Sequence, residues 1–181
     1  MSTNLNRIVT VVDDAGRSVF ADTEPVPSSV TLGLTIHNIW GGTADGIPTV
    51  GAGIDPSAVP FPFFPGPGGH RIILVEFPAV AGDAHGDTDP EAAEQAAAAA
   101  MTDQPGLVDV FDPDDPGFHT TDTVDYGICV DGEMWLVLDE GAERHLTPGT
   151  VVVQRGTRHS WQNRGARPCT MLFVILGAER V

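Results

Sequence analysis

The chain has 181 residues, of which 41% are hydrophobic, and its formal net charge is −16. This length and composition predict a globular protein built as one well-buried domain. All nine basic residues are arginine, which excludes lysine Schiff-base and pyridoxal chemistry, and the acidic balance argues against nucleic-acid and anionic-membrane partners.

The first seventy residues are expected to supply strands and a long loop. Short apolar stretches bounded by turn residues predict strands at 7–12, 18–20 and 30–40. Residues 41–69 are rich in glycine and proline and are interpreted as a loop. We expect its aromatic residues to close over a hydrophobic edge or the mouth of a pocket; these are Phe61, Phe63 and Phe64.

The middle of the chain contains one strong strand and one helix. The apolar run at 70–77 predicts a strand. The alanine-rich stretch at 90–101 predicts a short surface helix or lid, because Asp89 can cap it and Pro90 fits its first turn. This helix would lie in an acidic, alanine-rich insertion at 82–115. A low-complexity linker is the alternative interpretation of the segment.

The last third of the chain has the most regular pattern. Six strand-like runs are separated by tight turns, and they cover 124–130, 133–138, 143–146, 150–154, 158–162 and 169–176. Asp131 and Gly132 between two apolar runs predict a hairpin. Many short strands with tight turns are typical of an antiparallel barrel or sandwich, so the predicted fold class is all-β.

Two histidines and one aspartate form the candidate site. Side chains alternate along a strand, so His119, Thr121, Asp125 and Cys129 can share one face, as can His159 and Trp161 on a later strand. If the strands meet, His119, Asp125 and His159 make a two-histidine, one-carboxylate set suited to a divalent metal such as Fe, Mn, Ni or Zn. The alternative is a metal-free barrel in which both imidazoles hydrogen-bond to Asp125.

The order of these residues resembles the two motifs of the cupin superfamily. In the first motif, His119 matches the first histidine, Thr121 stands in place of the second, Asp125 replaces the usual glutamate, and Gly132 follows at the expected distance. The second motif opens at Pro148 and Gly149 and continues through Gln154, Arg155 and Gly156 to His159 and Asn163. The resemblance covers about residues 116–176. The sequence around these two motifs is similar in detail to small bacterial and fungal single-domain cupins.

The resemblance implies a double-stranded β-helix, or jelly roll, with the site inside the barrel. The expected organisation is a single domain over 1–181, with N-terminal strands and a loop at 1–70 and the barrel at 71–178. Single-barrel cupins commonly dimerise, so we expect a homodimer to which the N-terminal strands contribute. No apolar run has the length of a membrane span, and the N-terminus lacks a signal pattern, so a cytoplasmic protein is expected.

The predicted function is a metal-dependent cupin enzyme, a lyase (decarboxylase or dehydratase) or a dioxygenase, acting on an apolar or aromatic metabolite. Asp125 and His159 are the candidate catalytic residues, and Asp125 could also act as a base. Candidate pocket residues are Thr121, Cys129, Gln154 and Trp161. The alternative function is a metal-free, non-catalytic barrel that binds or senses a small ligand.

Overall fold

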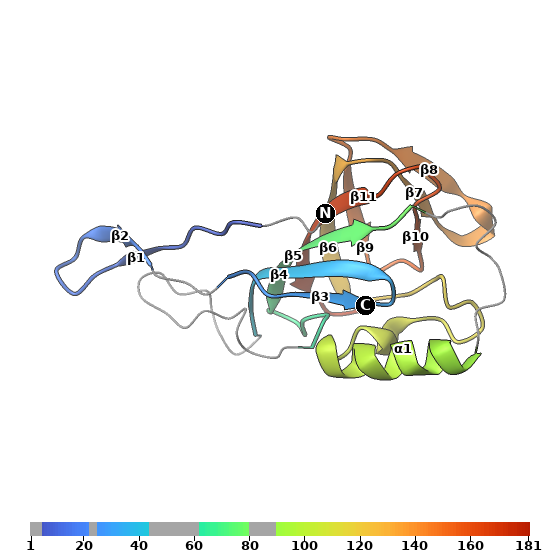
Figure 1. Ribbon diagram of the computed structural model, residues 1–181, viewed down its shortest axis with the longest axis horizontal. Coiled ribbons are helices and arrows are strands. Elements are labelled where there is room, and N and C mark those ends of the chain that lie inside the picture. The colour runs from blue at the N-terminus through green and yellow to red at the C-terminus, as the bar shows by residue number, and fades with distance from the viewer. Residues whose placement is uncertain (1–4, 22–24, 44–61, 80–89) are drawn as a thin grey trace.

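The computed structural model describes residues 5–21, 25–43, 62–79 and 90–181 of the chain. Within these ranges the protein is an all-β jelly roll with one α-helix, as the sequence predicts (Figure 1). No helix in the described ranges is both long enough and apolar enough to cross a membrane.

The larger sheet forms the wall on which the site is built. Its six antiparallel strands lie in the order β3-β4-β5-β11-β6-β9. β11 lies between β5 and β6 because the final strand returns to the centre of the sheet. The bounds are β3 Ser28–Thr31, β4 Leu34–Gly42, β5 His70–Phe77, β6 Thr123–Asp131, β9 Val151–Arg155 and β11 Cys169–Gly177.

Two smaller sheets complete the β structure. β7 pairs with both β10 and β8 in a three-stranded antiparallel sheet. A separate hairpin of β1 and β2 lies away from the barrel (Figure 1). The bounds are β1 Thr10–Val12, β2 Ser18–Phe20, β7 Met134–Val137, β8 Glu143–Leu146 and β10 Ser160–Gln162, with short 3₁₀ helices η2 Val108–Val110 and η3 Asp139–Gly141.

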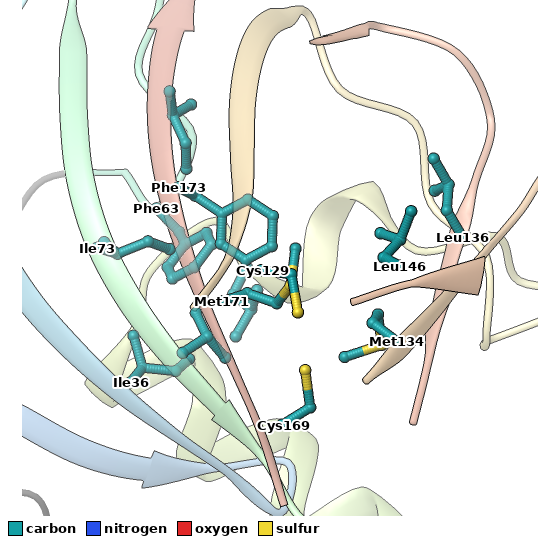
Figure 2. Packing of buried hydrophobic residues seen from close by; sticks show 13 residues of the cluster. Ile36, Phe63, Ile73, Cys129, Met134, Leu136, Leu146, Cys169, Met171 and Phe173 are labelled. Carbon is teal, nitrogen blue, oxygen red and sulfur yellow. The ribbon is translucent and has the colours of Figure 1, made fainter. Parts of the chain in front are cut away.

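The core is filled by alternate residues of the central strands. On β11, Cys169, Met171, Phe173 and Ile175 are buried while the residues between them are less so, which is the pattern of a strand with one interior face. The sulfurs of Cys129 and Cys169 point toward one another between β6 and β11 (Figure 2). Both thiols are free and buried, and burial raises the pKa of each. They are therefore packing groups rather than reactive nucleophiles.

Two turns differ from the sequence-based expectation. The predicted strand at 30–40 is divided by a two-residue turn at Leu32 and Gly33, both of which have positive φ, so β3 and β4 form a hairpin. The predicted hairpin at Asp131 and Gly132 is wrong, because β6 and β7 belong to different sheets. Gly132 is nevertheless required there: its φ is +80°, and an added Cβ would lie 2.5 Å from the Pro168 carbonyl oxygen.

Helix α1, Pro90–Asp103, confirms the predicted helix and extends it by two residues. The residue that follows anchors it to the sheet. Gln104 is buried, its Nε2 donates to Ser29 Oγ at 2.9 Å, and its Oε1 accepts from Asn38 Nδ2 at 3.4 Å. The helix therefore lies along the β3–β4 side of the barrel (Figure 1).

Candidate functional site

A reciprocal backbone bridge brings the two candidate histidines together. The His119 amide donates to the His159 carbonyl at 2.9 Å, and the His159 amide donates to the His119 carbonyl at 3.0 Å. The centres of the two imidazole rings consequently lie 4.1 Å apart. Residues forty positions apart in the chain thus form one polar pair inside the barrel.

The ring of His159 has a defined proton position. Its Nδ1 lies 2.8 Å from the Thr157 carbonyl oxygen, which can only accept a hydrogen bond, so Nδ1 carries the proton and Nε2 keeps a free lone pair. Gln154 supports the same turn, because its Nε2 donates to the Thr157 carbonyl at 3.1 Å and to the Thr157 hydroxyl at 2.5 Å. A neutral imidazole of this tautomer is a proton acceptor and a metal ligand.

His119 is held by an acidic loop that closes on itself. Phe118 accepts a backbone hydrogen bond from Asp112, and Phe118 itself donates to Asp115. Arg158, next to His159, binds this loop: its guanidinium contacts Asp112 at 2.8 Å and Asp115 at 3.3 Å and lies 4.1 Å from the centre of the Phe118 ring. A third contact of Arg158, to Asp139 at 3.1 Å, ties the loop to the smaller sheet.

Asp125 supplies the carboxylate from the middle of β6. The residue is 7% exposed, and its Oδ1 is buried without a hydrogen-bond partner among the described residues. Burial raises the pKa of Asp125 to about 6, and the hydrogen bond with Thr123 opposes that shift. Such a carboxyl group is an acceptor in need of a donor, which is a typical property of a ligand site.

The two imidazoles are kept neutral by the same surroundings. Burial, together with the nearby His159, lowers the pKa of His119 to about 3, and burial lowers the pKa of His159. Nδ1 of His119 is also buried without a partner among the described residues. The site therefore offers polar atoms to a ligand without a positive charge of its own.

A cavity of about 860 Å³ opens over these three side chains. Its walls are mainly apolar and come from β4, β5, β11, helix α1 and the loop before His119. His119, Asp125 and His159 lie in its lining together with Trp161, whose indole meets the His159 ring edge-on at 5.6 Å. This volume is that of a small-molecule site.

The other predicted pocket residues lie outside the lining. Thr121 is buried and accepts a hydrogen bond from Thr123 at 2.8 Å, Cys129 lies in the core, and Gln154 is engaged with Thr157. The three side chains are buried as predicted, but they contact neighbouring protein atoms instead of lining the cavity. Of the three phenylalanines expected near the mouth, Phe63 and Phe64 line the cavity, and Phe61 lies outside the described residues.

Sequence reasoning missed several residues that shape the site. Phe111 lines the cavity with its ring 5.4 Å from that of His119, and Ala96 and Ala97 of α1 form part of the wall. Arg158 was also missed, although it adjoins His159. It contacts the acidic segment 112–115 in the structure, but the two are far apart in the sequence. The accumulation of aspartates before His119 was the signal that could have indicated an arginine partner.

The predicted metal set is only partly assembled. Among the described residues, no three histidine, cysteine, aspartate or glutamate side chains are grouped closely enough to hold a metal ion. The two rings of His119 and His159, tilted by 52° to one another, offer two imidazoles, whereas Asp125 shares their cavity without joining that group. The three-ligand set of His119, Asp125 and His159 stays a prediction.

Several curated proteins resemble part of this chain. A phomopsin biosynthesis cluster protein, protein C', from Diaporthe leptostromiformis is 45% identical over 76 residues, which is 41% of this chain and 40% of that protein. The cupin-domain-containing oxidoreductase fogC of Aspergillus ruber is 38% identical over 78 residues, or 41% of this chain and 38% of that protein. The matched part of the chain thus spans about two fifths of these relatives' length.

These similarities and the jelly-roll topology support a small protein of the cupin superfamily. No family model matches the chain. Among solved structures, the cupin domain of Schizosaccharomyces pombe Cnp3 is 10% identical, with a TM-score of 0.47 over 94% of this chain and 86% of that one.

The buried carboxyl group of Asp125 gives a stability prediction. Because folding raises the pKa of Asp125 from 3.8 to about 6, the folded state favours the protonated acid, and stability is lost as the pH rises through that interval. Asp125→Asn removes the charge, so we expect the variant to be more stable than the wild type by about 2–3 kcal/mol at pH 8. Urea denaturation across the pH range measures the difference.

Asp131→Asn is the matched control for this prediction, because Asp131 also lies on β6 but is exposed and paired with Arg167. The advantage of Asp125→Asn should disappear near pH 4, where the wild-type acid is protonated. An Asn variant that is less stable at pH 8, or a difference that does not change with pH, would contradict the placement of Asp125.

Proposed function

We propose that this protein is a cupin enzyme that acts on an apolar or aromatic small molecule bound inside the barrel. The observation that carries the proposal is the apolar cavity that ends on His119, Asp125 and His159, two of which have buried polar atoms without a partner among the described residues. Partial similarity to cupin-domain-containing oxidoreductases and to biosynthesis-cluster proteins supports it. The activity of the protein as a whole is part of this proposal, because the similar segment covers at most about two fifths of each relative.

The side chains of the site suit proton transfer. The carboxylate of Asp125 and Nε2 of His159 are both proton acceptors, and they line the same cavity. Removal of a substrate proton by Asp125 fits lyase chemistry such as dehydration, and it also fits the activation of a hydroxyl group before oxygenation. The apolar walls exclude water from the reacting groups.

An activity screen tests the proposal. Apolar and aromatic alcohols, ketones, aldehydes and carboxylic acids are incubated with the protein in air, with and without divalent metals, and products are followed by mass spectrometry. We expect at least one compound to be converted, and conversion to fall by about 100-fold or more in Asp125→Asn because a proton acceptor is lost. Asp131→Asn should retain full activity, and equal activity in both variants would contradict the role of Asp125.

A metal-free binding or sensor barrel is the second candidate function. It is favoured by the observation that the described residues contain no group of three metal-holding side chains. In this case the same compounds would bind in the cavity and none would be converted under any condition. The screen therefore separates the two functions.

Metal dependence is a distinct part of the proposal. His119 and His159 would hold a divalent ion of Fe, Mn, Ni or Zn, with Asp125 as the third ligand, and the free lone pair on Nε2 of His159 supports this assignment. A bound ion would polarise a substrate carbonyl or enol, or activate dioxygen. With the ion bound, Asp125 and His159 would keep the proton-transfer roles given above.

Metal content tests this part directly. Protein from metal-supplemented cultures should carry stoichiometric metal by elemental analysis, and His159→Ala should lose most of it because an imidazole ligand is removed. His145→Ala is the control, since His145 is exposed and hydrogen-bonds to Glu133 at 2.8 Å. Equal metal content in the wild type and His159→Ala would contradict the assignment.

We propose a homodimer in which the β1–β2 hairpin contacts a second copy. Ile8 and Phe20, in and beside this hairpin, are each 77% exposed, and an isolated two-stranded hairpin has little stability in water. Exposed valines of β9, Val151 and Val153, offer a complementary apolar face on the same chain. β9 also lies at one end of the larger sheet.

Light scattering after gel filtration measures the assembly. The wild type should have twice the chain mass at micromolar concentration, and Ile8→Glu combined with Phe20→Glu should give a monomer because the apolar contact is lost. Met101→Glu, at an exposed apolar position of α1, should remain a dimer. A monomeric wild type or a dimeric double variant would contradict the proposed contact.

A further inference from the structure

We infer that, when the site holds no metal, the ligand of this cavity is a molecule with a hydroxyl group on an aromatic or apolar body, such as a phenol, and that carboxylate ligands are rejected. The inference rests on the proposed function, since it concerns the same cavity. It follows from a count of hydrogen-bond donors, acceptors and charges among the residues that line it.

The polar end of the cavity is rich in acceptors. Oδ1 of Asp125 is a buried acceptor without a partner among the described residues. Nε2 of His159 is an acceptor because the proton of that ring is used on the Thr157 carbonyl. His119 adds one donor and one acceptor as a neutral imidazole, and its Nδ1 is also unpartnered among the described residues. A ligand hydroxyl would satisfy these acceptors, whereas a carboxylate would leave them unsatisfied.

The lining carries no counter-charge for an anion. None of the described residues that line the cavity is arginine, and the sequence contains no lysine. Arg158 approaches from outside the lining and is engaged with Asp112, Asp115 and Asp139. Arg71 lies over the ring of Phe63 and is not among the residues that line the cavity. A carboxylate placed beside Asp125 would therefore be desolvated next to a like charge.

The walls are suited to a ring or a short alkyl body. Phe64, Phe111, Trp161 and Phe173 face the cavity from four different segments, and Trp161 meets Phe173 edge-on at 5.3 Å. Ala96 and Ala97 line it from helix α1 with short side chains, which leaves room for a substituent on the ring. Aromatic walls with a few acceptors at one end favour a ligand that is apolar except at one end.

Calorimetric titration with three matched compounds tests the inference on the full-length protein at pH 8, after treatment with a chelator to remove any metal. The probes are para-butylphenol, para-butylanisole and para-butylbenzoate, which share a ring and chain but differ at one end. We expect the phenol to bind about tenfold or more tightly than the anisole, because only the phenol donates a hydrogen bond to a charged acceptor. The benzoate should bind more weakly than both.

Asp125→Asn and Asp131→Asn separate the local charge from the overall charge. Both remove one negative charge from β6, but only Asp125 lines the cavity. The preference for phenol over benzoate should shrink in Asp125→Asn and persist in Asp131→Asn. Tighter binding of the benzoate than of the phenol would overturn the inference alone. Failure of all three compounds to bind would overturn the proposed function as well.

Discussion

The backbone bridge between His119 and His159 is the interaction on which the site depends. Its two hydrogen bonds, at 2.9 and 3.0 Å, join the segment before β6 to the segment before β10. The larger sheet contains β6 and the smaller sheet contains β10, so the bridge also connects the two sheets at the end of the barrel. The imidazoles face one another because their backbones are paired, and the contacts of Arg158 hold the acidic loop that leads into this bridge.

The site is polar at the expense of stability. Asp125 has a buried oxygen and His119 a buried nitrogen without partners among the described residues, and burial shifts the pKa of each group toward its neutral form. Unsatisfied buried groups destabilise a folded domain, and the core between β6 and β11 compensates with close packing of apolar side chains. A ligand hydroxyl that donates a hydrogen bond to Asp125 would satisfy one of these groups, which links their burial to recognition.

Sequence patterns predicted the strands and the meeting of the histidines, but not how neighbouring atoms use the polar groups. Alternation along 123–131 and 169–177 reports burial directly, so β6 and β11 could be predicted, and the motif order identified His119, Asp125 and His159. Gln154 was predicted either as a pocket residue or as a plain turn contact at a strand end, and its hydrogen bond to the Thr157 carbonyl is the turn contact. The Leu32–Gly33 turn was hidden within an apolar run, and the acidic partners of Arg158 are far from it in sequence.

The central claim is that the barrel presents two adjacent neutral imidazoles, one of which has its Nε2 lone pair free for a ligand. Nitrogen-15 NMR of the histidine side chains, recorded with ring-to-ring proton contacts, tests it most directly. We expect His159 to carry its proton on Nδ1 and its ring protons to contact those of His119. A His159 protonated on Nε2, or two rings without mutual contact, would contradict this arrangement.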